Sequence, residues 1–304
     1  MASATDVPAA PVAGPGGTAG EVLLAYVSEQ YAEMLRQEHR LRDGEADAIH
    51  KMRVSTRRLR SVLASYRNLL PGEPAKRIRA ELKWLAQVLG AARDAQVMRH
   101  RLQELVDAQP EELVRGPVSA RIDAELTGRY TEAVETIHSV LGAGRYSAVV
   151  QDIGALLEDP QFTGKAGKPA LKVGRRLIRS DLRRLRNRVR EAKQEHDDAR
   201  RAEIFHEARK DAKRLRYAAE AYVPVGGGHA TAMVEAAESV QKALGEHQDS
   251  VVTRELLARL GAHPGRGGSG FTYGRLHAVE EQQAREAEKH FRRLWKGFAA
   301  AYGW

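Results

Sequence analysis

Cysteine is missing from the 304 residues, and aromatic side chains make up only 6% of them. Without cysteine the chain has no disulfide, no thiolate nucleophile and no cysteine-ligated metal. No apolar run reaches the roughly 18–20 residues that a membrane-spanning helix needs, and residues 1–20 lack the basic start and apolar stretch of a signal peptide. We therefore expect a cytoplasmic protein without a membrane partner.

An alternating strand pattern is also absent, whereas apolar residues, mainly Leu, Val and Ala, recur at helical spacing. This spacing predicts helices over about 21–42, 46–70, 74–108, 117–142, 145–158, 169–196, 199–222, 229–260 and 273–300. Three segments rich in Gly, Pro or Ala separate or precede them: a disordered lead-in over 1–20, a linker over 159–169 and a loop over 261–270. Long helices with short connections are typical of antiparallel bundles, so the expected fold class is all-α.

An internal repeat divides the chain. IHKMRVSTRRLRSVLASY (49–66) aligns without a gap to FHEARKDAKRLRYAAEAY (205–222), and VLGAARDAQVMRHRL (88–102) aligns to ALGEHQDSVVTRELL (243–257) at nearly the same offset. Two matches in the same order indicate a duplicated helical unit. We expect two halves related by a pseudo-twofold axis, the first over about 21–158 and the second over about 170–304.

Positive charge is concentrated in the repeated segment. The net charge of the chain is +9, yet residues 51–60 alone carry five Lys or Arg and no acid, and residues 172–193 carry ten against two. In the first half His50, Arg53, Arg57 and Arg60 follow i, i+3, i+7, i+10 spacing, which places them within about 80° of one helix face. His206, Arg209, Lys213 and Arg216 repeat the pattern in the second half. The sequence therefore predicts two cationic stripes suited to an anion.

Each stripe has an apolar seam beside it, which should hold the helix against its neighbours. The seam residues are Ile49, Met52, Thr56, Leu59, Leu63, Tyr66 and Leu70 in the first half, and Phe205, Ala208, Ala212, Leu215, Ala219 and Tyr222 in the second. A third stripe comprises Lys172, Arg176, Arg179, Arg183, Arg186 and Arg190, with Ile178, Leu182, Leu185 and Val189 on the buried side. The alternatives for this third stripe are a helix face that is only solvated and a face matched by acids on a neighbouring helix.

Several kinds of site are not indicated. No GxxxxGK[ST] loop occurs, and GRGGSG (265–270) does not follow a strand, so it reads as a connection. His196-Asp197-Asp198 and His247-Gln248-Asp249 lack converging ligands, so we expect no metal and no other cofactor. The stripes supply only cations, whereas phosphate hydrolysis normally requires acidic metal ligands or an activated nucleophile. We expect no enzymatic activity, and we expect Asp94 and Asp249 to orient neighbouring arginines.

The motif HKMRVSTRRLR (50–60) closely resembles the HxxRxxxRRxR signature of the CHAD family, the conserved histidine α-helical domain. HEARKDAKRLRY (206–217) resembles the family's second-half counterpart, and LGAARD (89–94) and LGEHQD (244–249) resemble its LGxxxD elements. The resemblance covers nearly all of 21–302. It implies two four-helix-bundle-like halves around a basic central groove or channel, so that residues 21–304 would form one such domain.

The resemblance also implies a ligand, long-chain inorganic polyphosphate, and leaves open an association with polyphosphate granules. The implied phosphate contacts in the first half are His50, Arg53, Arg57, Arg58 and Arg60. Those in the second half are His206, Arg209, Lys210, Lys213, Arg214 and Arg216, and the cationic helix adds Arg176, Arg179, Arg183, Arg186 and Arg190. Gln248 stands where the first half has Arg93, so the two sites are not equivalent. A nucleic-acid binder is the main alternative, and a polyphosphate-hydrolysing enzyme is a third. The aromatics near the stripes, Tyr66, Phe205, Tyr217 and Tyr222, are few for base stacking.

Overall fold

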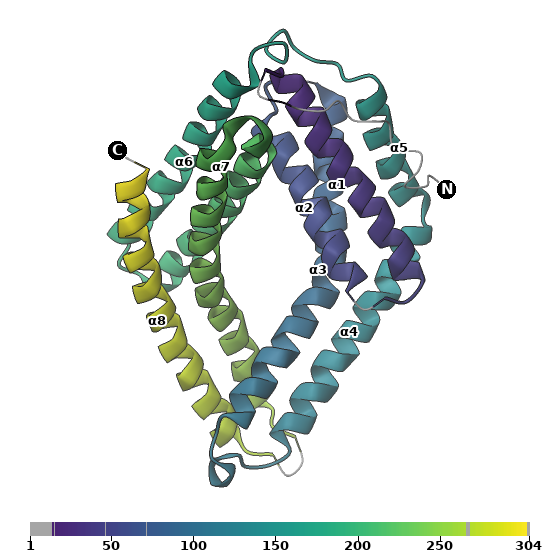
Figure 1. Cartoon of the computed structure of the whole chain (residues 1–304). Coiled ribbons are helices and arrows are strands. Elements are labelled where there is room, and N and C mark those ends of the chain that lie inside the picture. Colours follow the sequence, from purple (N-terminus) through teal and green to yellow (C-terminus); the bar gives the residue numbers. More distant parts are fainter. Residues whose placement is uncertain (1–13, 15, 46, 71, 266–267, 303–304) are drawn as a thin grey trace. The chain divides into compact units, whose positions relative to one another are not determined.

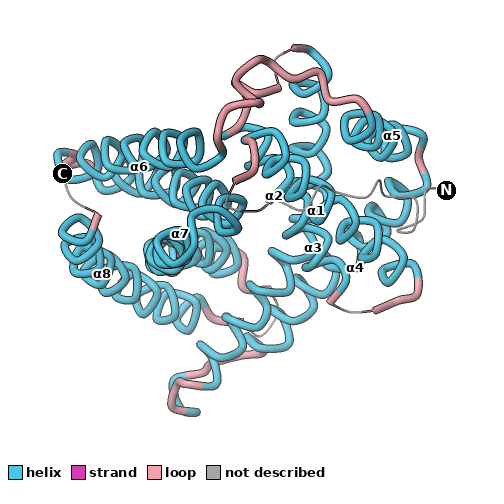
Figure 2. Tube along the Cα trace, turned by 45° about the horizontal axis from the view of Figure 1, so that its top comes forward, coloured by secondary structure: helices cyan, strands magenta, loops and turns pink. Residues whose placement is uncertain are grey.

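The computed structural model describes residues 14, 16–45, 47–70, 72–265 and 268–302. Over these residues the chain is helical and forms no strand (Figure 2), so the expected all-α class is confirmed. Figure 1 labels the helices, which are α1 (Ala19–Arg42), α2 (Ala48–Ser65), α3 (Glu73–Asp107), η2 (Glu111–Leu113), α4 (Val118–Gly142), α5 (Gly144–Glu158), α6 (Ala170–Gln194), α7 (Asp198–Ala262) and α8 (Gly270–Ala301). Helices α3, α4 and α5 agree with the expected ranges to within one residue.

Helix α1 begins two residues before its expected start because a capping box fixes its first turn. The Glu21 N–H donates to Thr18 Oγ1 at 3.3 Å, and the Thr18 N–H donates to Glu21 Oε2 at 2.7 Å. Most of the expected lead-in over 1–20 lies outside the described residues.

The expected linker over 159–169 packs on the start of α1. The Ala19 N–H donates to the Lys168 carbonyl and the Gly20 N–H donates to the Ala166 carbonyl, both at 2.9 Å, and the Ala170 N–H donates to the Gly17 carbonyl at 3.0 Å. These bonds satisfy backbone donors that the first turn of a helix leaves unpaired. The segment therefore anchors the N-terminus of α1 as well as connecting α5 to α6.

Two expected helix ends were wrong. Helix α2 ends at Ser65, five residues before the expected end, because a turn in which the Leu69 N–H donates to the Tyr66 carbonyl at 2.8 Å lets Leu69 and Leu70 be buried. Helix α7 continues through Pro224 and breaks only at Gly227, whose φ of 55° and ψ of −143° are readily adopted by glycine alone. Beyond Gly227 the helix resumes, so α7 corresponds to the two helices expected over 199–222 and 229–260.

The chain forms two compact units, each assembled from three separate segments. Unit 1 comprises residues 1–93, 131–183 and 214–235; unit 2 comprises residues 94–130, 184–213 and 236–304. Each unit takes residues from both expected sequence halves, because α3, α4, α6 and α7 all pass from one unit to the other. The pseudo-twofold relation between halves stays a prediction.

In unit 1, α2 packs along α1, as Figure 1 shows. Every expected seam residue of α2 is buried, and so are Leu69 and Leu70 beyond its end. The corresponding seam of α7, from Phe205 to Tyr222, is buried along its whole length. Ile178, Leu182, Leu185 and Val189 of α6 are buried as well. The expected apolar sides of all three cationic helices are therefore confirmed.

A core in unit 2 is built by the ends of four helices, α3, α4, α7 and α8. Its members are Leu102, Leu105, Val106, Val118, Ile122, Leu126, Leu256, Leu257, Leu260, Tyr273 and Leu276. Aliphatic residues dominate this cluster, as expected from the low aromatic content of the chain. Among the described helices of either unit, none is both long enough and apolar enough to cross a bilayer.

Tyr222 fills a close contact between α6 and α7 in unit 1. Its hydroxyl donates to the Leu171 carbonyl at 3.1 Å, and its ring lies against the backbone of Gly174 and Gly226. A Cβ at Gly174 would lie 2.1 Å from Tyr222 Cδ2, far inside van der Waals contact. Glycine is therefore required at position 174 by packing, although glycine lowers helix propensity.

We expect Gly174→Ala to lower the free energy of unfolding by about 1–3 kcal/mol, the usual cost of overpacking a core. The matched control is Gly154→Ala in α5, where a Cβ would meet only Tyr31 Oη at 3.7 Å, an ordinary contact. The control should gain up to about 1 kcal/mol from helix propensity. Urea denaturation followed by circular dichroism measures both changes, and equal stability of Gly174→Ala and the parent would contradict the tight packing.

Candidate anion-binding faces

The first cationic face lies in unit 1 and is called the α2 face here: His50, Arg53, Arg57 and Arg60 of α2, with Arg93 of α3. His50 is exposed apart from partial cover of its ring, and Arg53, Arg57 and Arg60 are half-buried, because the neighbouring seam of α2 is packed against α1. Arg93 joins the face through its electrostatic contact with His50. The helical spacing of the stripe thus places the positive charges of its arginines close to one another and to His50.

The cations of the α2 face repel one another. Burial lowers the pKa of His50, and the charges of Arg93, Arg57 and Arg53 lower it further, against a weaker opposite effect of Asp47. Burial and the charge of Arg57 also lower the pKa of Arg60. Arg57 Nη2 contacts the Tyr217 hydroxyl at 3.4 Å, while its buried Nε has no hydrogen-bond partner among the described residues. A bound anion would relieve this repulsion.

We expect His50 to titrate below the usual histidine pKa of about 6.5, and we expect Arg93→Gln to raise that pKa. Removing a neighbouring positive charge makes the imidazolium less unfavourable. The control is Arg99→Gln on the same helix, because Arg99 is exposed and paired with Asp123 at 2.6 Å. An NMR titration of the imidazole resonances measures the pKa in each variant. A His50 pKa unchanged by Arg93→Gln would contradict the electrostatic contact.

The second cationic face lies in unit 2 and is called the α7 face here: His206, Arg209, Lys210 and Lys213. Burial lowers the pKa of His206, as does the charge of Lys210, and Gln248 forms a hydrogen bond with its side chain. Lys210 is exposed and pairs with Glu207 at 2.7 Å. The α7 face is therefore cationic but partly neutralised.

Two residues of LGEHQD shape the surroundings of Arg209. A Cβ at Gly245 would lie 3.2 Å from Arg209 Nε and 3.3 Å from its Nη2, so the guanidinium lies directly over the glycine backbone. Asp249 is largely buried; burial raises its pKa, and the charges of Arg209, Arg101 and Lys213 oppose that rise. The structure thus brings Asp249 beside Arg209, the arrangement expected from the sequence.

The repeat is visible in the neighbours of the two histidines. His50 lies beside Arg93 in unit 1, and His206 lies beside Gln248 in unit 2. Positions 93 and 248 are the pair that the second repeat match aligns. The two faces therefore share a local design and differ by one charge at this position.

Helix α6 carries an exposed row of cations, with Arg176, Arg179 and Arg183 in unit 1 and Arg190 in unit 2. In the part of the chain that the structure describes, no carboxylate forms an ion pair with any of these four. Arg186 is half-buried and takes part in other interactions. The alternative of a face matched by acids is thus not met at these four arginines, whereas the alternative of a solvated face stays open.

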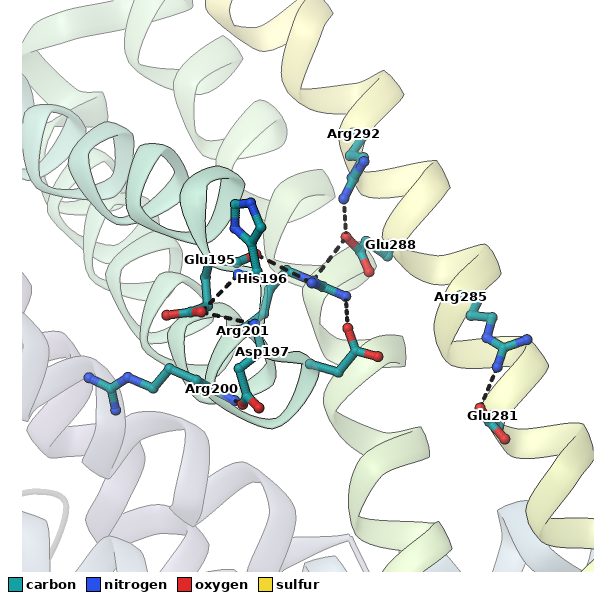
Figure 3. Close-up of polar contacts among 10 residues, drawn as sticks. Glu195, His196, Asp197, Arg200, Arg201, Glu281, Arg285, Glu288 and Arg292 are labelled. Carbon is teal, nitrogen blue, oxygen red and sulfur yellow. Dashed lines mark hydrogen bonds and ion pairs between the residues drawn. The ribbon is translucent and has the colours of Figure 1, made fainter.

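Cations elsewhere in unit 2 do have carboxylate partners. Arg201 pairs with Asp198 at 2.5 Å and with Glu288 at 3.5 Å; Figure 3 shows Arg201 pointing toward Glu288. Arg292 also contacts Glu288, at 2.5 Å, and Arg285 pairs with Glu281. The pair of Arg285 and Glu281 is exposed, whereas Glu288 is shielded from water and engages two arginines. High arginine content alone therefore does not produce the cationic faces.

Three arginines of the motif also meet carboxylates. Arg58 and Arg216 both contact Glu220, and Arg214 contacts Asp181, all within unit 1. The sequence analysis did not predict these ion pairs. The available signals were weak: Glu220 interrupts the apolar run YAAEAY (217–222), and Asp181 is one of two acids in 172–193.

A cleft of about 870 Å³ adjoins His206 and Gln248 in unit 2. Arginines line it, but its walls also carry Glu191, Asp198, Glu203, Glu207 and Glu255. Arg188 pairs with Glu191 at 2.8 Å, and Arg200 pairs with Glu203 at 2.5 Å. This cleft has no excess of positive charge, which separates it from the faces. No cluster of three or more His, Asp or Glu suited to a metal ion is found among the described residues.

The fold and the faces define an all-helical protein with clustered cations suited to a ligand of repeated negative charge. A family model, the CHAD domain, matches residues 25–258, and the chain belongs to this family.

Two uncharacterized proteins of Mycobacterium tuberculosis, from strains CDC 1551 / Oshkosh and H37Rv, are each 36% identical to the chain over 262 residues, or 85% of this chain and 49% of the relative. The chain thus spans about half the length of these curated relatives.

Two solved structures share the fold. PptA from Streptomyces chartreusis has a TM-score of 0.77 and 23% identity, covering 92% of this chain and 100% of that one. The CHAD domain from the plant Ricinus communis has a TM-score of 0.71 and 24% identity, covering 94% of each chain.

Proposed function

We propose that this CHAD-domain protein binds long-chain inorganic polyphosphate and does not cleave it. The main support is the α2 face, where the strongest electrostatic neighbours of His50 are arginines rather than carboxylates. Such clustering costs free energy in the free protein, at a few tenths of a kcal/mol per like-charged neighbouring pair on a helix. A polyanion removes this cost and forms charge-assisted hydrogen bonds.

Polyphosphate suits the faces because it carries about one negative charge per phosphate and has no bases to recognise. Arg and Lys displace its counterions as they do on nucleic-acid backbones. The proposed contacts are His50, Arg53, Arg57, Arg60 and Arg93 on the α2 face, and His206, Arg209, Lys210 and Lys213 on the α7 face. The exposed row of α6 adds Arg176, Arg179, Arg183 and Arg190.

Burial of the nearby aromatics disfavours a nucleic-acid binder. Tyr66, Phe205, Tyr217 and Tyr222 are each at least 96% buried, so none offers a ring face on which a base could stack. Hydrolysis of polyphosphate has less support still, because the acids beside the α7 face already interact with its cations: Glu207 pairs with Lys210, and Asp249 is largely buried beside Arg209.

A calorimetric titration of the parent protein with long polyphosphate, single-stranded RNA and ATP tests this proposal, with phosphate release followed in the same samples. We expect the tightest binding for polyphosphate, because a long chain offers many contacts at high effective concentration, and we expect no release of phosphate. Tighter binding of RNA at the same salt concentration would establish the nucleic-acid alternative, and steady release of phosphate would establish an enzyme.

Neutralising either face should weaken polyphosphate binding. We expect Arg53→Gln/Arg57→Gln and Arg209→Gln/Lys213→Gln each to lower the affinity by about tenfold to several hundredfold, because each loses two charge-assisted contacts, partly screened by water. The control, Arg36→Gln/Arg285→Gln, removes the same charge from exposed pairs within α1 and α8 and should change the affinity by less than about threefold. Equal losses in all three variants would indicate an unspecific effect of net charge.

Polyphosphate affinity should rise as the pH falls from about 8 to 6. In the free protein the pKa of His50 and that of His206 are both lowered, whereas a bound polyanion raises them. Binding therefore takes up protons, and the gain in affinity begins near the pKa of the complex and is complete below the pKa of the free protein. The variant His50→Ala/His206→Ala should lose most of this dependence. Calorimetry across the pH range, with the parent as control, measures it; an unchanged dependence would assign it to other groups.

A further inference from the structure

Glu220 of α7 collects donors from three helices of unit 1. Tyr26 of α1 donates its hydroxyl to Oε2 at 3.0 Å, and Arg216 Nε donates to Oε1 at 3.1 Å. Arg58 of α2 lies with Nε 3.0 Å from Oε2 and donates through Nη2 to Oε1 at 3.4 Å. The Glu220 side chain is only 14% exposed. One shielded carboxylate thus engages two arginines of the motif.

The pKa of Arg58 is raised and that of Arg60 is lowered, although the two residues are close neighbours on α2. Burial lowers the pKa of Arg58, but the charge of Glu220 and its hydrogen bond outweigh burial and raise that pKa overall. The pKa of Arg60 is lowered by burial and by Arg57. Arg58 therefore has its counter-charge within the protein, whereas the charge that shifts the pKa of Arg60 is that of another cation, Arg57.

Asp181 of α6 is the carboxylate partner of a third motif arginine, Arg214. Arg214 Nε donates to Asp181 Oδ1 at 2.7 Å, and Arg214 Nη2 donates to the Ala64 carbonyl at 3.0 Å. Ser65 donates to Asp181 Oδ2 at 2.8 Å. The Asp181 side chain is 5% exposed. This network ties the C-terminal end of α2 to α6 and α7, at the place where α2 stops.

To take Arg58, Arg214 or Arg216 as a full partner, a phosphate would have to displace it from a shielded carboxylate, Glu220 or Asp181. Breaking a buried ion pair from one side costs more than a charge-assisted hydrogen bond typically returns. These arginines should therefore keep their carboxylates when ligand is present.

We propose that Arg58, Arg214 and Arg216 are positioning residues, held by Glu220 and Asp181, and that they do not touch the phosphate chain. The motif then has two kinds of cation: Arg57 and Arg60 face the ligand, while Arg58 fixes α2 against α1 and α7. This inference rests on the proposed function only where ligand contacts are concerned. The ion pairs themselves can be tested without ligand.

The salt dependence of polyphosphate affinity distinguishes the two kinds of arginine. On a flexible single-stranded polyanion, each contacting cation contributes roughly 0.7 to the slope of log affinity against log salt concentration. We expect Arg57→Gln to reduce the slope by about that amount and Arg58→Gln to leave it unchanged. The two variants are matched, because they remove the same charge from adjacent positions. An equal reduction in both would overturn the proposal and make Arg58 a phosphate contact.

A double-mutant cycle tests the ion pair without ligand. Arg58→Gln and Glu220→Gln should each lower the melting temperature by several degrees, since each leaves a charged partner buried. The double variant should recover much of the loss, because two amides can bond to each other. It also supplies a folded protein for the salt measurement if Arg58→Gln alone is too unstable. Additive losses would overturn the positioning role. If the parent bound no polyphosphate, the proposed function would fail, while this cycle would still decide the pair.

Discussion

Burial of one side of α2 and α7 is the constraint on which the rest of the structure depends. Each helix carries an apolar seam, from Ile49 to Tyr66 in α2 and from Phe205 to Tyr222 in α7, and each seam is fully buried. Once the seam is packed, the helical repeat leaves no freedom in where the other residues lie. The cations are then held near one another even though they repel. The protein keeps this repulsion because the hydrophobic contribution of the seam is far larger than the cost of a few like-charged neighbours.

The carboxylates of unit 1 separate two uses of arginine within one short motif. Asp181 and Glu220 are shielded from water and engage the guanidinium groups that lie nearest the packed helices. His50 and Arg60 have cations as their main electrostatic neighbours. Positive charge in such a segment is therefore a poor measure of binding capacity, because part of it is internal to the fold.

Local patterns in the sequence predicted the fold class, most helix boundaries and the buried side of each cationic helix, because these depend on the spacing of residues along one helix. The predicted end of α2 at residue 70 and the predicted break of α7 before Pro224 were wrong, since both depend on tertiary packing. The pairing of Arg58 with Glu220 joins residues 162 positions apart and left no local pattern. The neighbours of His50 and His206 were easier to predict, because the internal repeat aligns Arg93 with Gln248 in the sequence itself.

The glycine of LGEHQD shows how a missing side chain can govern a charge elsewhere. Because Gly245 has no side chain, the Arg209 guanidinium lies close to the backbone there, and a Cβ at 3.2 Å from its Nε would push it outward by a few tenths of an ångström. The distance of the Arg209 charge from the helix backbone thus depends on Gly245, which lies in a different segment from the arginine. An arginine transferred to the matching position of a related chain would bring the same charge. Its guanidinium would lie equally close to the backbone only if that chain also had a glycine at the position of Gly245.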